Sequence, residues 1–324
     1  MRDKIAILFS FTILLAVATS LAAVPSFGQE PNASEIVVNL AAGSVDVCVA
    51  KGALLLAATD EKVEPGTHPP EIAELGVGRM GVLLGAVEWI RPGTGAVPVR
   101  LDVELEESVR AVGPMQSDGS AGEQASDIET IGIALLEQIR IVATAFHHKI
   151  DIAPDEPLVE MVLADYEDGY GFEVWVLRYR IEQESLGNGY YETRVLRPSY
   201  TQLYPPEKGQ PRTLMEIRYP LDIHGPTLLE LLKQNDPRLQ PIRAASSQLF
   251  DATGHVLEGE SQKAHPDDIG NFLRAALPAV HPPGTRVAIA EITEEKDFVW
   301  LVQPTEPHPS SESRDSDAPT LYKH

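Results

Sequence analysis

GSVDVCVAKGALLLAATDEK, residues 43–62, is the stretch that decides the fold. Residues 45–50 alternate through β-branched side chains, and residues 53–58 form a continuous apolar run after Gly52. Alternation and short apolar runs that follow a turn glycine are both typical of strands. Cys48 lies within the alternating part, so we interpret it as a small buried hydrophobic residue. The stretch therefore predicts two strands joined at Gly52, and a further strand is predicted just before them at 35–40.

The N-terminus has the three parts of a secretory signal peptide. Residues 2–4 are Arg-Asp-Lys, residues 5–24 are almost wholly apolar or small, and a small-residue exit follows. We expect cleavage near 22–28, so that residues 1–28 are removed and the protein is exported to the periplasm or secreted. The alternative is an uncleaved leader that anchors the protein in a membrane, because about 20 apolar residues can span a bilayer.

Charge and cysteine content exclude several classes of protein. The 324 residues include 48 acidic and 26 basic side chains, a formal net charge of −22. Nucleic-acid binding depends on Lys and Arg that neutralise phosphates, so this composition argues against a nucleic acid as partner. A single cysteine, Cys48, excludes an intrachain disulfide and a cysteine-rich metal site. We expect contact with a membrane only if the leader is not cleaved. Other partners are unknown from the sequence, and a homo-oligomer is possible.

The predicted elements come in blocks of strands and blocks of helices, which favours an α+β fold. Apolar residues at helical spacing predict a long helix at 126–149, and two arms rich in β-formers predict a hairpin at 158–182. We predict one domain at 29–303 and a disordered tail, rich in Pro, Ser and acidic residues, at 304–324. The other predicted elements are strands at 79–90, 98–105, 189–196, 213–219, 286–292 and 297–302, and helices at 226–233, 240–252 and 267–280.

This order, together with two motifs, resembles the proteasome β-type subunits, which are N-terminal-nucleophile hydrolases. The motifs are the stretch at 43–62 and RMGVLLGAVEW at 79–89. In that family a strand begins at a freed Thr or Ser, and the next strand ends in Ala-Ala-Asp-x-Arg. Here Ala-Ala-Thr-Asp-Glu-Lys stands at 57–62, with one extra residue. The resemblance implies an αββα sandwich, in which the segment 184–225 would be an insertion.

The resemblance also implies catalytic residues. Such enzymes use the hydroxyl of the first residue of the processed chain, and the freed α-amino group, with a pKa of about 8, acts as the base. Cleavage at Gly43-Ser44 would make Ser44 the nucleophile, and Asp60 stands at the offset of the family's active-site Asp. The family's lysine has no counterpart at 69–77, and Lys62, which lies earlier, is the candidate to replace it. The alternative is that Gly43-Ser44 is an ordinary turn before a strand.

No motif indicates a metal or a cofactor. The histidines show neither H-x-x-x-H nor H-E-x-x-H spacing, and His147 and His148 would point about 100° apart on a regular helix. Asp165, Glu167 and Asp168 resemble half of a calcium loop without its distant Glu, so we interpret them as solvated charges at a hairpin turn. Nucleophile-elbow, Walker and dinucleotide-binding motifs are absent from the sequence. We expect no metal and no cofactor.

Tyrosines are concentrated in one part of the chain, since eight of the nine lie within 166–219. Tyrosine combines apolar area with a polar tip, which suits a surface that binds sugars or peptides. Aromatic residues are also common in strands, so core packing is the alternative. If the tyrosines form a surface, Tyr190, Tyr191, Tyr200 and Tyr204 are the candidate ligand-binding residues.

We therefore expect an exported acidic protein with a non-catalytic binding or assembly role. Two alternatives stay open. One is a secreted N-terminal-nucleophile amidohydrolase that uses Ser44 after cleavage at Gly43-Ser44. The other is a glycan-binding protein that uses the tyrosine-rich segment.

Overall fold

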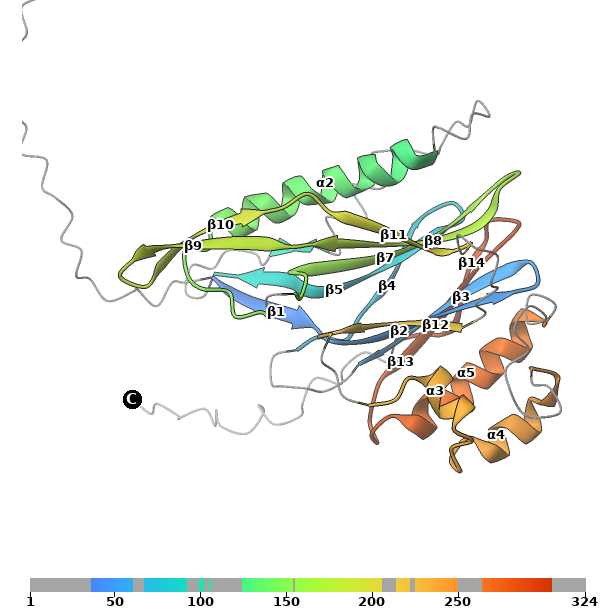
Figure 1. Ribbon diagram of the computed structural model, residues 1–324. Coiled ribbons are helices and arrows are strands. Elements are labelled where there is room, and N and C mark those ends of the chain that lie inside the picture. The colour runs from blue at the N-terminus through green and yellow to red at the C-terminus, as the bar shows by residue number, and fades with distance from the viewer. Residues whose placement is uncertain are drawn as a thin grey trace, which may run out of the picture.

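A computed structural model describes residues 36–60, 67–91, 99–101, 105, 124–153, 155–205, 214–221, 225–249 and 264–304. The fold is α+β, as the blocks of predicted elements indicate. Two mainly antiparallel sheets pack face to face, and helices cover the outer face of each sheet (Figure 1). Three apolar cores fill the spaces between these four layers.

One sheet, called the β2 sheet below, has five strands in the order β12-β2-β3-β13-β14. At its centre, β2 (Gly43–Ala50) and β3 (Ala53–Asp60) form a hairpin with a two-residue turn. Every residue of β2 and β3 is buried, because one face packs on the other sheet and the other face packs on helices. Two covered faces explain why the apolar run in β3 does not alternate. The remaining strands are β12 (Leu214–Tyr219), β13 (Val287–Thr293) and β14 (Phe298–Val302).

The other sheet, called the β5 sheet, is built around the 12-residue strand β5 (Arg79–Ile90). Its strands follow the order β1-β5-β7-β8-β11, and β4 and β6 also pair with β5. β9 (Ile181–Gly187) and β10 (Tyr190–Val195) form a separate two-stranded sheet (Figure 1). The remaining strands are β1 (Val37–Ala41), β4 (Ile72–Gly76), β6 (Val99–Arg100), β7 (Val159–Glu167), β8 (Gly171–Tyr179) and β11 (Ser199–Tyr204).

The long helix α2 (Gln124–Thr144) covers the β5 sheet and buries Ile131, Leu135 and Ile139 against it. Their spacing places these three side chains on one face of the helix. Three shorter helices cover the β2 sheet and share its outer core (Figure 1). They are α3 (Leu228–Lys233), α4 (Gln240–Ala245) and α5 (Pro266–Val280), with a 3₁₀ turn at Ser247–Leu249 after α4.

The end of the long helix differs from the prediction of 126–149. The helix ends at Thr144, because the following residues make tertiary contacts instead of a further helical turn. The ring of Phe146 packs edge-on against Trp89, with centroids 6.0 Å apart. The backbone N–H of Tyr191 donates to the carbonyl of His147 at 2.7 Å, which ties the segment to β10.

The N-terminal leader, the C-terminal tail and the segment 184–225 stand out in the sequence. The predicted signal peptide and the predicted tail beyond Pro304 lie outside the described residues. Over the part of the chain that is described, no helix has both the length and the apolar character needed to cross a membrane. The segment 184–225 supplies a strand to each large sheet, since β11 pairs with β8 and β12 pairs with β2.

Candidate functional site

The chain crosses from one sheet to the other between β1 and β2. β1 ends at Ala41 in the β5 sheet, and β2 begins at Gly43 in the β2 sheet. A Cβ at Gly43 would lie 1.9 Å from the backbone oxygen of Thr59 and 3.0 Å from Cγ of Pro70. Close packing therefore fixes the crossover, and with it the position of the neighbouring Ser44.

Ser44, the predicted nucleophile, is fully buried between β12 and β3. Its cross-strand partner on β3 is Thr59, which is also fully buried, and the two hydroxyl oxygens lie 2.5 Å apart. Alternation along β2 places Ser44 on the same face as Cys48, which packs against the helix layer. The hydroxyl of Ser44 therefore faces the helices and not the space between the sheets.

Asp60, the predicted partner of Ser44, stands opposite Gly43 in the hairpin. Successive residues alternate between the faces of a strand, so Asp60 projects to the face opposite that of Thr59 and Ser44. Arg286 binds its carboxylate: the backbone N–H donates to Oδ1 and Nε donates to Oδ2, each at 2.7 Å. Lys62, the third predicted catalytic residue, lies outside the described residues.

A buried acidic pair lies two residues further along β2. Asp46 is the cross-strand partner of Glu216 on β12. One oxygen of Glu216 bonds to Nε of Arg218, and the other accepts the N–H of Leu228 at the start of α3, at 2.9 Å. The oxygens of Asp46 have no hydrogen-bond partner among the described residues. Burial, and then the charge of Glu216, raise the pKa of Asp46 well above its ordinary value of 3.8.

We expect the stability of the protein to fall as the pH rises above the ordinary pKa of Asp46, and Asp46→Asn to reduce that fall. The folded state retains the proton above pH 3.8, where the unfolded chain loses it. The folded state therefore binds more protons from pH 3.8 up to the raised pKa, and rising pH favours unfolding across this window. Urea denaturation from about pH 4 to pH 8 measures the slope. Asp151→Asn, at an exposed position, is the control, and an equal pH slope in wild type and Asp46→Asn would contradict the expectation.

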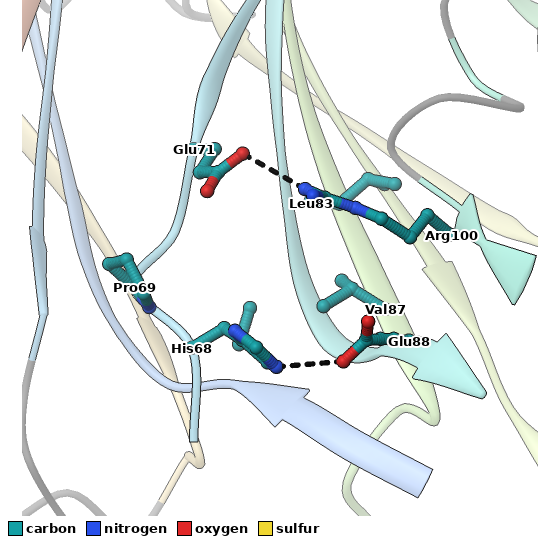
Figure 2. A pocket seen from close by; sticks show the side chains of 8 residues that line it. His68, Pro69, Glu71, Leu83, Val87, Glu88 and Arg100 are labelled. Carbon is teal, nitrogen blue, oxygen red and sulfur yellow. Dashed lines mark hydrogen bonds and ion pairs between the residues drawn. The ribbon is translucent and has the colours of Figure 1, made fainter. Parts of the chain in front are cut away.

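A small, solvent-open groove lies beside the crossover. Its floor is apolar and is formed by Ala41 on β1 and by Leu83 and Val87 on β5, all of them buried. One wall is the segment 68–71, which precedes β4, and the opposite wall is formed by β5 and β6 (Figure 2). The groove thus combines an apolar floor with walls that carry charge.

Two side-chain contacts cross the groove from wall to wall, a hydrogen bond and an ion pair (Figure 2). Nε2 of His68 lies 2.9 Å from Oε2 of Glu88, and the same oxygen accepts Nδ2 of Asn39 at 2.8 Å. Arg100 Nη2 lies 3.1 Å from Oε2 of Glu71. About half of the side chain of Glu71, Arg100 and His68 is exposed, whereas that of Glu88 is 17% exposed.

The groove and the Gly43-Ser44 peptide are held by the same segment. The carbonyl of His68 accepts the N–H of Ala42 at 3.3 Å, and the N–H of His68 donates to the carbonyl of Leu40 at 2.8 Å. Pro70, two residues on, packs against Gly43. A change at the crossover would therefore be transmitted directly to one wall of the groove.

The four candidate tyrosines do not share one surface. Tyr200 packs against the core beneath α2, whereas Tyr204 packs against the core between the sheets. Tyr190 and Tyr191 lie on β10, where Tyr190 is 39% exposed and its ring lies 5.9 Å from that of His148. Tyr190 is therefore the member of the group most available to a ligand.

Two residues of the half calcium loop, Asp165 and Asp168, have a protein partner. Asp165 is buried and accepts from Arg79 on the neighbouring strand at 2.7 Å, so its interpretation as a solvated charge was wrong, and Asp168 accepts from Lys296 at 2.8 Å. Within the described residues, no group of three or more His, Cys, Asp or Glu side chains is arranged to hold a metal ion.

Comparison of the chain with protein-family profiles and with curated proteins gave no match. The groove was not predicted from the sequence, although one signal of it was present. Glu88 is a single acidic residue in the otherwise apolar run of β5, and a lone charge in such a strand indicates a specific partner. His68 and Glu71 carried no signal, since they lie in a Pro-rich segment with ordinary loop composition.

Proposed function

We propose that the protein is an exported, non-catalytic binding protein with an αββα scaffold similar to that of N-terminal-nucleophile hydrolases, and that it binds its ligand in the groove beside β1. The layer order helix, sheet, sheet, helix supports the scaffold. So does the order of elements along the chain, from the β2–β3 hairpin through the long helix to the closing α5, β13 and β14.

The burial of Ser44 is the observation that carries the non-catalytic part of the proposal. A nucleophile has to reach the substrate and needs a base within hydrogen-bond distance. The hydroxyl of Ser44 has no exposed surface, is bonded to Thr59, and faces the helix layer. Asp60 lies on the other face with its carboxylate held by Arg286. Ser44 and Asp60 thus act as structural residues.

Cleavage at Gly43-Ser44 would also create a buried charge. The new α-amino group would lie within the β2 sheet, at a residue with no exposure. Placing an unpaired ammonium group in such a site costs several kcal/mol or forces the group to lose its proton. This cost favours an intact peptide, in which β1 stays paired with β5 and closes the floor of the groove.

The start of the mature chain tests the proposal. We expect N-terminal sequencing and intact mass to give a chain that begins near residues 23–29 and contains an uncut Gly43-Ser44 peptide. A β-lactone, which acylates an N-terminal nucleophile, should leave the mass unchanged, and Ser44→Ala should behave as wild type in the same assay. A chain that begins at Ser44, or acylation that Ser44→Ala abolishes, would instead establish the hydrolase.

The groove is the proposed ligand site because of its shape and chemistry. Ligand sites are concave and largely apolar, with a few polar groups that fix orientation. The groove has these properties, since its lining combines the buried apolar residues Ala41, Leu83 and Val87 with the polar side chains of His68, Glu71, Glu88 and Arg100.

A further inference from the structure

We infer that the ligand of the groove is an organic cation, with an ammonium or guanidinium group attached to a short apolar body. The inference rests on the proposed function, because it assigns a ligand class to the same groove. It is carried by the polar atoms that the groove leaves available, by the charge of the groove, and by its floor.

The two carboxylates of the groove offer acceptors to a ligand. Oε2 of Glu88 is used by His68 and Asn39, and Oε2 of Glu71 is used by Arg100. The second oxygen of each carboxylate, Oε1, has no partner within the described residues and is not shut off from solvent. A ligand that supplies donors can therefore bond to both carboxylates.

The charge of the groove favours a cation. The formal charges of two carboxylates, Glu71 and Glu88, and of one guanidinium, Arg100, sum to about −1. The chain as a whole carries a formal charge of −22, so the surrounding potential also attracts cations. The carboxylate of Glu88 is only 17% exposed, which limits screening by solvent at that end of the groove.

The apolar floor of the groove favours a ligand whose cationic group is attached to an alkyl chain. Leu83 and Val87 lie on β5 beside Arg100 and Glu88 (Figure 2), and Ala41 also lines the groove. An alkyl chain of about four carbons that packs on this floor removes its own apolar surface from water. Alkylguanidinium and alkylammonium ions, including the side chains of Arg and Lys in a peptide, have this composition.

Three matched probes test the inference by isothermal titration calorimetry on the mature full-length protein. Butylguanidinium is the cation, butylurea is its neutral analogue, and valerate is an anion of similar length. We expect butylguanidinium to bind at least about tenfold more tightly than the other two probes, because a charge-assisted hydrogen bond is roughly twice as strong as a neutral one. Affinity should also fall as the salt concentration rises.

Variants then locate the site. Glu88→Gln and Glu71→Gln should each weaken butylguanidinium binding by about tenfold, because each removes one negative charge from the groove. Glu74→Gln, on the exposed side of β4 and outside the groove lining, should bind as wild type. If Glu88→Gln lowers the thermal stability of the protein, the result for Glu71→Gln locates the site. The side chain of Glu71 is half exposed, so we expect this substitution to leave the fold intact.

The outcomes separate the two claims. Preferred binding of valerate or butylurea, with an affinity that the groove variants change, would overturn the cation as the ligand and leave the groove as a binding site. No binding of any probe at millimolar concentration, or binding that Glu88→Gln and Glu71→Gln both leave unchanged, would overturn the groove as the ligand site. Tight binding of butylguanidinium that both variants weaken supports both claims.

Discussion

Gly43→Ala should destabilise the protein by about 3 kcal/mol or more, a large part of the stability of an ordinary domain. The added Cβ would lie 1.9 Å from the backbone oxygen of Thr59, which belongs to a strand paired on both sides and cannot move away. It would also lie 3.0 Å from Pro70, in the wall of the groove. The free energy of unfolding, measured by urea denaturation with circular dichroism, gives the cost.

Gly76→Ala is the matched control. Gly76 has a φ of +139°, close to the +156° of Gly43, but a Cβ there would meet nothing within 4 Å. The control therefore carries the backbone cost of a positive φ, about 1 kcal/mol, without the steric overlap. Equal losses in the two variants would show that the crossover can adapt and that the contact with Thr59 does not fix it.

Contiguous patterns predicted most of the fold. The hairpin of β2 and β3 could be predicted because both of its faces are covered, which gives an apolar run that stands out in any sequence. β11 was missed, because it lies between the predicted strands at 189–196 and 213–219 in a stretch that contains several prolines. Its prolines, Pro198 and Pro205, flank the strand and do not interrupt it. The end of α2 was placed too late because Phe146 continues the helical spacing, whereas the ring in fact packs on Trp89.

The candidate site could be predicted only in part, because the face of a strand on which a residue lies depends on hairpin register. The two-residue turn between β2 and β3 pairs Ser44 with Thr59 and Gly43 with Asp60. This register places Asp60 on the face opposite that of Ser44, and a slip of one residue would exchange the faces. A count along the sequence gives the spacing of Ser44 and Asp60, but not their faces.

Removing one partner of the buried ion pair between β5 and β7 should have the second large effect. Arg79 and Asp165 are cross-strand partners, and Oδ2 of Asp165 accepts Nη2 of Arg79 at 2.7 Å and Nε at 3.1 Å. The two side chains are only 9% and 12% exposed. Arg79→Met would leave the buried carboxylate of Asp165 without its counter-ion. Asp165→Leu would leave the buried guanidinium of Arg79 without its counter-ion. Each change should cost about 3–5 kcal/mol.

The double variant shows whether charge or packing is responsible. With both charges removed, nothing buried is left unpaired, so Arg79→Met/Asp165→Leu should cost clearly less than the sum of the single changes, with a coupling energy of about 2–3 kcal/mol. The exposed pair of Asp168 and Lys296 is the control, and Asp168→Asn should cost less than about 1 kcal/mol. Additive losses at Arg79 and Asp165 would mean that side-chain packing, rather than the ion pair, joins β5 to β7 at this end of the sheet. In that case the buried charges would be better explained as a source of specificity in strand pairing than as a source of stability.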